Sequence, residues 1–317
     1  MDVVAFGELL IDFACIGSDS DGYPTMAAHP GGAPANFLAA LAKYGAGTAL
    51  LGKVGNDTFG KLLVGTLQKA GIDTSGIVVA DDVFTTLAFV TFDSTGDRSF
   101  SFARKPGADT QLSFEEVNLA LIDEAKVFHF GTLSLTDEPA RSATYQAVAY
   151  AKARGKLITF DPNLRKPLWG SLEEAKRQIL WGLEQADVVK ISDEEVEFLF
   201  GLDVQTGARY ILDTFGTKLV FVTCGADGCF FMNPVVSGHV PSLSGISVID
   251  TTGAGDIFGG SAVYGLLQTG KAPDALTEEE LRSVVCFACT AAGLPPRDPA
   301  ASPVYRRGKK RKNICNR

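Results

Sequence analysis

A carboxylate follows a glycine-rich turn late in the chain, in Asp250-Thr251-Thr252-Gly253-Ala254-Gly255-Asp256. A β-branched run precedes the turn, and a helical pattern with Asp256 in its first turn follows it. Glycines let successive backbone N–H groups converge at a helix N-terminus, which creates a site for an anion. A carboxylate beside a bound phosphate is useful when it accepts a proton from the group that attacks that phosphate. The segment therefore indicates phosphoryl transfer.

The same segment has two other interpretations. Asp256 can be a helix-capping residue after a glycine turn. Gly253, Gly255 and Gly259 also space as GxGxxxG, with Asp274 about twenty residues further on, as in a dinucleotide-binding loop. We discount the dinucleotide loop because too little chain follows it to build a dinucleotide-binding half-domain.

A second polar set lies near the start of the chain. Asp12 comes just past an expected strand at residues 2–7, at the sheet edge where α/β proteins bind ligands. Gly31 and Gly32 allow a close approach of the backbone, and Asn36 adds an amide. A carboxylate, bare backbone and an amide suit hydrogen bonds to a polyol. The alternative interpretation is a turn followed by a helix cap.

Alternating helices and strands must position these residues. From residue 115 onward, helical periodicity and apolar runs alternate, which predicts right-handed βαβ units and a mostly parallel sheet with helices on both faces. The expected helices are 37–45, 115–124, 137–153, 171–185, 193–200 and 277–293, and the expected strands after the first are 126–130, 156–160 and 187–191. A period-two pattern predicts a β-hairpin over 85–104, whereas residues 14–30 are polar and irregular.

Over about residues 2–293 the chain resembles the PfkB, or ribokinase-like, carbohydrate kinases, whose C-terminal signature is DTTGAGD and whose N-terminal signature has the same glycine pair and Asn. The resemblance implies one kinase domain with a ribokinase-like three-layer α/β/α fold. Its central sheet would be mostly parallel, and a small β-sheet lid would come from about residues 12–30 and 84–104. Such a lid excludes water that competes for the phosphoryl group.

The resemblance also implies roles for single residues. In the family the last Asp of DTTGAGD is the catalytic base and the turn before it is the anion hole, and the segment at 161–165 resembles the DPNxR of fructokinases and, more loosely, of 2-keto-3-deoxygluconate kinases. The residues implied to act on the phosphoryl group are Asp256, Gly253, Ala254, Gly255 and Arg104. The residues implied to bind the sugar are Asp12, Gly31, Gly32, Asn36, Arg104, Asn163, Arg165 and Asp256. A solvated Arg104 at the end of a hairpin is an equal alternative.

The implied cofactors are ATP and Mg²⁺. Residues that match the nucleotide-binding positions, including the TxGxxG motif, are Lys190, Thr223, Gly225, Gly228, Gly253 and Gly255. Glu195 matches the Glu of the family's NxxE motif, which acts on magnesium through water, although Ser192 stands where the motif has Asn. A single Glu with the ATP phosphates is sufficient, because Mg²⁺ prefers few carboxylates and several waters.

The chain departs from the family pattern after residue 293. The loop that completes a monovalent-cation site in the family is not legible there, so Asp250 and Thr252 would be the remaining half of a K⁺ site. Residues 295–317 form an atypical tail with a basic run at 306–312. We expect a solvated, disordered tail rather than a contact with nucleic acid or a membrane.

Composition limits the alternatives. The chain has 317 residues, 46% of them hydrophobic, which suffices for one large domain with a sizeable core. The formal net charge of −8 argues against nucleic acid as the main partner. The first residues enter a strand pattern at once, and no apolar run reaches membrane-spanning length, so we expect a cytoplasmic protein without a membrane partner.

These observations predict a sugar kinase that is most like a fructokinase and phosphorylates a primary hydroxyl of fructose with ATP. Kinases for 2-keto-3-deoxygluconate, another sugar or a nucleoside are the alternatives within the family. The acid substrate would require an extra cation in the lid, and residues 14–30 offer none. A non-catalytic sugar-binding member is the alternative of another class. A lid with an exposed apolar face also allows a homodimer.

Overall fold

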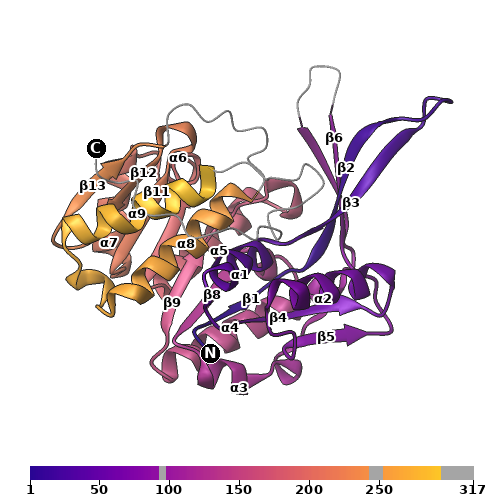
Figure 1. Cartoon of the computed structure of the whole chain (residues 1–317), viewed down its shortest axis with the longest axis horizontal. Coiled ribbons are helices and arrows are strands. Elements are labelled where there is room, and N and C mark those ends of the chain that lie inside the picture. The colour runs from indigo at the N-terminus through magenta and orange to yellow at the C-terminus, as the bar shows by residue number, and fades with distance from the viewer. Residues whose placement is uncertain (93–97, 243–252, 294–317) are drawn as a thin grey trace.

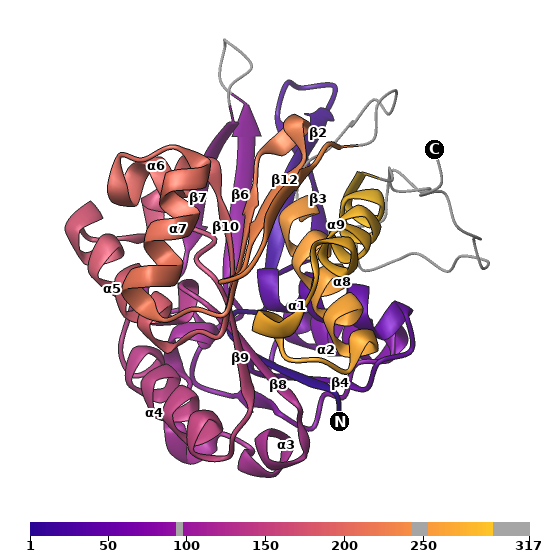
Figure 2. The same ribbon diagram turned by 90° about the vertical axis from the view of Figure 1, so that its left-hand side faces the viewer.

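The computed structural model of the protein describes residues 1–92, 98–242 and 253–293. A nine-stranded sheet lies between two layers of helices (Figure 1, Figure 2). Its strands, in spatial order, are β13 (Ser237–Val240), β12 (Cys229–Met232), β11 (Leu219–Thr223), β10 (Val188–Ser192), β9 (Leu157–Asp161), β8 (Val127–Gly131), β1 (Val3–Phe6), β4 (Thr48–Gly55) and β5 (Ile77–Ala80). All neighbours pair in parallel except β11 with β12 and β12 with β13.

Each central strand is apolar throughout because both faces of the sheet are covered. Strand β1 shows this alternation: Val4 and Phe6 enter one hydrophobic cluster, whereas Val3 and Ala5 enter another on the opposite face. The helices on the first face are α3 (Leu119–Glu124), α4 (Ala140–Ala153), α5 (Leu172–Gln185), α6 (Asp193–Phe200) and α7 (Val204–Phe215). The helices on the second face are α1 (Ala33–Lys43), α2 (Thr58–Ala70), α8 (Ala254–Thr269) and α9 (Glu278–Gly293). The predicted three-layer α/β fold is therefore confirmed.

A separate four-stranded sheet projects from the main body (Figure 1). Its order is β3 (Pro24–Gly31), β2 (Leu10–Ser18), β6 (Leu87–Phe92) and β7 (Arg98–Ala103). The antiparallel pairing of β6 with β7 confirms the predicted hairpin. The interpretation of residues 14–30 as irregular was wrong, because β2 and β3 pair along most of that segment. Within residues 14–30 the side chains of these strands are half-buried or exposed, so the apolar alternation that identifies a strand is missing.

Helix α1 begins four residues earlier than predicted, at Ala33 instead of Phe37. The sequence Gly31-Gly32-Ala33-Pro34 suggested a turn, but proline fits the first turn of a helix, where its missing N–H has no partner to lose. Asn36 therefore lies inside the helix. Among the described residues, no helix combines the length and apolar character that crossing a membrane requires.

Candidate active site

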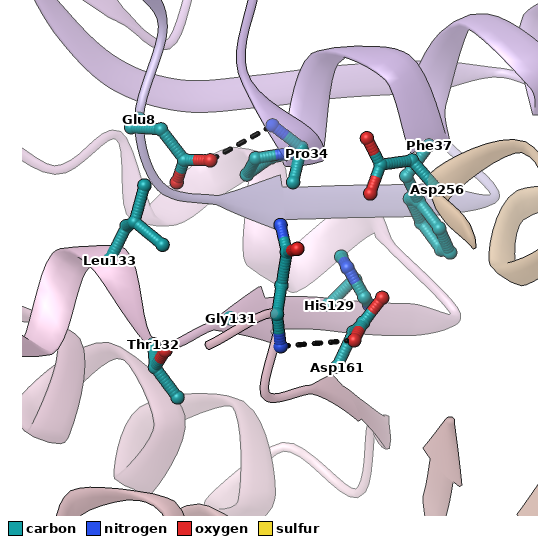
Figure 3. Close-up of a pocket in the computed structure, with 11 residues that line it drawn as sticks. Glu8, Pro34, Phe37, His129, Gly131, Thr132, Leu133, Asp161 and Asp256 are labelled. Carbon is teal, nitrogen blue, oxygen red and sulfur yellow. Dashed lines mark hydrogen bonds between the residues drawn. The ribbon is translucent and has the colours of Figure 1, made fainter. Parts of the chain in front are cut away.

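A pocket lies where strands β1, β8 and β9 end and helices α1 and α8 begin (Figure 3). Its lining residues are Glu8, Ala33, Pro34, Phe37, His129, Gly131, Thr132, Leu133, Asp161, Asn163 and Asp256. The pocket occupies the carboxyl edge of the parallel strands, where α/β sheets bind ligands.

Asp256 lies in the first turn of α8 and is 8% exposed. The Nδ2 of Asn36 donates a hydrogen bond of 2.9 Å to its Oδ2, which joins two residues that are 220 positions apart. Burial raises the pKa of Asp256, and the nearby Asp161 raises it further, while Asn36, Lys190 and Arg165 oppose the shift. A carboxylate with a raised pKa is a stronger base than an exposed Asp, which suits proton abstraction.

The Oδ1 atom of Asn36 is buried and has no hydrogen-bond partner within the described ranges. Buried polar atoms are nearly always paired, so an unpaired acceptor beside Asp256 marks a place for a ligand donor. The hydroxyl of a bound polyol has the required chemistry. The structure thus brings together Asn36 and Asp256, which the sequence assigned to one site.

The glycine turn before Asp256 lies against a cation. Gly253 is the N-cap of α8 with φ 75°, a left-handed conformation that favours glycine. A Cβ on Gly255 would lie 2.9 Å from the Nζ of Lys190, so the ammonium group of β10 packs against the turn. Burial opposes the charge on Lys190, but Asp161, Glu195 and Asp256 outweigh it and raise its pKa. The positive charge that the turn itself lacks therefore comes from a neighbouring strand.

Close packing of α8 on α1 fixes the position of this turn. A Cβ on Gly260 would overlap the backbone oxygen of Phe37, so only glycine lets the two helices approach so closely. Ser261 adds a contact of 3.1 Å between its Oγ and the Oη of Tyr44. The small residues after Asp256 are thus explained by helix packing, which also holds Asn36 against Asp256.

The segment after β9 is a loop whose backbone conformation is fixed by a local hydrogen bond. The Asn163 N–H donates to the Oδ1 of Asp161 at 3.2 Å, and Asn163 has φ 45°, an uncommon conformation for a residue other than glycine. Asp161 also forms an ion pair of 3.0 Å with Lys190. Arg165 is exposed, and its charge acts on Asp12 and Asp256. The loop therefore directs Asn163 into the pocket and keeps a cation near both carboxylates.

Asp12 lies on β2 and packs over the glycine turn before α1. A Cβ on Gly31 would overlap the Asp12 carboxylate, and a Cβ on Gly32 would lie 2.5 Å from the backbone oxygen of Glu8. Burial raises the pKa of Asp12 to about 6, the charge of Arg165 opposes the shift, and Asp256 adds to it. Both glycines are thus required by the protein's own packing around this carboxylate.

Arg104 lies outside the lining of the pocket and is 5% exposed. Its Nε donates to Asp109 at 2.8 Å, and its other nitrogens donate to the Thr136 hydroxyl at 2.7 Å and the Leu133 oxygen at 2.8 Å. Asp109 also contacts the Thr86 hydroxyl. In this arrangement Arg104 ties the end of β7 to the main body, and its role toward a ligand stays a prediction. The acidic partner, five residues downstream, was the signal that sequence reasoning overlooked.

Glu195 is occupied by backbone groups. One oxygen accepts from the Ser192 N–H at 2.9 Å in a capping box, and the other accepts from the Leu164 N–H at 2.8 Å. The carboxylate therefore links the start of α6 to the loop after β9. Its predicted action on magnesium remains a prediction.

The remaining predicted nucleotide residues follow β11. Thr223 ends that strand, Gly225 has φ 53°, and Gly228 has φ 99° and would overlap Val240 if it carried a Cβ. None of these three residues lines the described pocket, and their role toward a nucleotide stays a prediction. Asp250, Thr252 and the basic tail lie outside the described residues.

Two residues of the pocket, His129 and Glu8, are not among the site residues predicted from the sequence. His129 is buried, and its ring stacks on Phe37 with centroids 3.7 Å apart. Burial lowers its pKa to about 3, and the charge of Lys190 lowers it further, so the ring is neutral at pH 7. His129 is therefore a core residue that also lines the pocket.

Comparisons with known proteins agree with this geometry. Residues 1–296 match the family described as pfkB family carbohydrate kinase. This chain belongs to the pfkB family of carbohydrate kinases. It is 43% identical over 281 residues to fructokinase-1 of Zea mays, with 88% of this chain and 86% of the relative covered.

Two solved structures extend the comparison of this pfkB kinase. Fructokinase with bound ATP from Xylella fastidiosa has a TM-score of 0.84 and 32% identity, covering 92% of this chain and 91% of that chain. A double-mutant fructokinase from Vibrio cholerae O395, in a form with fructose, ADP and potassium ion bound, has a TM-score of 0.81 and 31% identity, covering 93% and 92%. The family resemblance and the ribokinase-like fold expected from the sequence are thus confirmed.

Proposed function

We propose that this kinase transfers the γ-phosphoryl group of ATP to a primary hydroxyl of fructose. The observation that carries the proposal is the buried Asp256, which accepts a hydrogen bond from Asn36 beside a glycine turn that packs on the Lys190 ammonium. A base, an anion site and a cation at one helix start fit phosphoryl transfer. The fructokinase names of the relatives at 43% and 32% identity support fructose as the acceptor.

In the proposed reaction Asp256 takes the proton from the sugar hydroxyl as that oxygen attacks phosphorus. Burial and Asp161 raise its pKa, which strengthens the base. The N–H groups of the turn Gly253-Ala254-Gly255, with Lys190, stabilise the charge that spreads over the phosphoryl oxygens. Arg165 adds a second positive charge, because it acts electrostatically on Asp256.

The sugar would lie between the glycine turn of α1 and the loop after β9. Asp12 and Asn36 offer carboxylate and amide groups, Gly31 and Gly32 offer backbone, and Asn163 lines the pocket. We assign the small sheet the role of a lid over this site. A lid that excludes water favours transfer to the sugar over hydrolysis of ATP.

Mg²⁺ would neutralise charge on the ATP phosphates when it is bound. The donor set fits a metal held mainly by phosphates and waters, because Glu195 directs both oxygens to backbone N–H groups and would reach the ion only through water. For K⁺, the potassium ion in the Vibrio cholerae relative supports a similar site here that includes Asp250 and Thr252.

We also propose that the enzyme acts in the cytoplasm and pairs with a second copy through the small sheet. Ile16 and Tyr23, on and beside the β2 and β3 strands, are 66% and 69% exposed, which is unusual for large apolar side chains. A single species of monomer mass in sedimentation would contradict the dimer, and recovery in a membrane or organelle fraction would contradict the location.

The decisive experiment measures ADP release with ATP, Mg²⁺ and a panel of sugars, with and without K⁺. We expect turnover to be highest with fructose. Turnover of another sugar alone would replace fructose as substrate, and fructose binding without any ADP release would overturn the kinase proposal. A K⁺-independent rate would contradict the cation site.

A further inference from the structure

Glu8 is a buried carboxylate that the mechanism above does not use. It follows β1 and is 3% exposed, yet it lines the pocket together with Asp161, Asn163 and Asp256. A buried charged group has a desolvation cost unless it is well paired, so its presence requires a reason. Burial raises the pKa of Glu8 to about 7.

One reason is structural. The Glu8 Oε1 accepts a hydrogen bond of 2.8 Å from the Ala33 N–H, the first N–H of α1, whose N-cap Gly32 has no side chain to do so. Gln would also accept this hydrogen bond, although a helix N-terminus favours a carboxylate. Capping therefore explains one oxygen of Glu8 and leaves the second oxygen unused.

The rest of the carboxylate has spare acceptor capacity. Within the described ranges it accepts a hydrogen bond from no other residue than Ala33, apart from a contact with its own backbone N–H. An ionised carboxylate has about four acceptor positions. Figure 3 shows its second oxygen turned away from the α1 turn and toward Leu133, on the other side of the pocket.

We propose that Glu8 binds the sugar directly, by accepting hydrogen bonds from hydroxyls remote from the one that is phosphorylated, and so determines which sugars are used. This inference rests on the proposed function. Asp256 lines one part of the pocket and Glu8 another, with Pro34 between them in Figure 3. A sugar with its reactive hydroxyl at Asp256 then presents its other end to Glu8.

Charged groups face Glu8 from two sides. Arg104 and Asp109 lie at the base of the small sheet. The charge of Arg104 lowers the pKa of Glu8, and the charge of Asp109 raises it. Asp161, Asp256 and the neutral His129 share the pocket with it. Protonation of Glu8 removes acceptor capacity, so its contribution to sugar affinity declines as the pH falls through about 7.

The test compares Glu8→Gln with wild type on fructose and on a set of analogues that each lack one of the hydroxyls other than the phosphorylated one. Gln keeps an acceptor for the Ala33 N–H but replaces the second oxygen with a donor. We expect kcat/KM for fructose to fall roughly 10- to 100-fold, as for loss of a charged hydrogen bond. The loss should disappear for at least one analogue, namely the one that lacks the hydroxyl bound by Glu8. The KM for ATP should stay unchanged.

Asp203→Asn is the matched control, because Asp203 caps α7 at an exposed position through the Gln205 and Thr206 N–H groups. It should leave the turnover of every sugar in the set unaffected. An equal loss for every sugar in Glu8→Gln, or no loss, would show that Glu8 only caps α1. If the wild type phosphorylates no sugar, the proposed function fails. If it phosphorylates fructose and Glu8→Gln is indifferent, only this inference fails.

Discussion

Two glycine turns precede helices α1 and α8 at the same edge of the sheet, and the groups around them suit different ligands. Around Gly31 and Gly32, a side chain would collide with Asp12 or with the backbone of Glu8, so the space is already filled by acceptors. At Gly255, a side chain would meet the flexible end of Lys190 and no other group of the described residues. The first turn therefore suits a ligand with hydroxyl donors, and the second suits an anion. Glycine beside a helix start does not by itself specify the ligand; the side chains from neighbouring strands do.

The largest effect is expected at the anion turn. Asp256→Asn keeps the shape of the side chain but removes the base, so kcat should fall by about 10²- to 10⁴-fold while fructose affinity changes little. Steady-state kinetics and calorimetric titration with fructose would measure the two effects. A comparable loss of both would show that Asp256 is structural.

The next largest effect is expected at Lys190, whose ammonium group packs against the same turn. Lys190→Met removes the ion pair of Asp161 and the positive charge beside Gly255. We expect kcat to fall roughly 10²-fold, as when one stabilising donor is lost. The dissociation constant of fructose is the control, because the α1 turn does not contact Lys190. A normal kcat would remove Lys190 from the anion site.

Glycine substitutions in the two turns should have different effects: a loss of stability in the first turn and a loss of activity in the second. Gly32 has φ 119° and no room for a Cβ, so Gly32→Ala should destabilise the fold by about 1–3 kcal/mol. Gly255→Ala lies in a helix and should unfold like the wild type but turn over more slowly, since it displaces Lys190. Chemical unfolding and ADP release would distinguish the pair. Equal unfolding free energies for the two variants would contradict the distinction.

The smallest effect is a pH-dependent gain in stability when Asp12, which packs on the α1 turn, is replaced. The folded-state pKa of Asp12 is raised to about 6, above the usual 3.8, so its ionisation destabilises the fold at pH values above about 6. Asp12→Asn should therefore increase the unfolding free energy at pH 8 by about 1–3 kcal/mol, and the gain should vanish near pH 4.

Asp203 is the control for Asp12, because its pKa is shifted in the opposite direction. Hydrogen bonds from Thr206 lower the pKa of this carboxylate, so Asp203→Asn should not stabilise the protein at any pH. Thermal unfolding scans from pH 4 to 8 would measure both variants. Stabilisation by Asp12→Asn that does not depend on pH would show that the burial of the charge is not its cause.

The sequence predicted the fold and both turns because their signals are local. Apolar runs identify β8, β9 and β10, and glycines before an amphipathic pattern identify a helix start. The partners of these turns are not local. Glu8 reaches the turn from 25 residues away, and Lys190 comes from another strand. Strands β2 and β3 were expected only from the family resemblance, because most of their side chains are half-buried or exposed and show no apolar alternation.

The close packing of α8 on α1 has a consequence for biosynthesis. The apolar side of α1 and residues such as Val3 and Val127 share a cluster with Val263. Until α8 has left the ribosome, that surface of the nascent chain has no cover, and contacts so distant in sequence form slowly. The hydrogen bond from Asn36 to Asp256 can form only after α8 has packed on α1. An incompletely synthesised chain therefore has no catalytic base in place. It also exposes an apolar surface to chaperones or to other nascent chains.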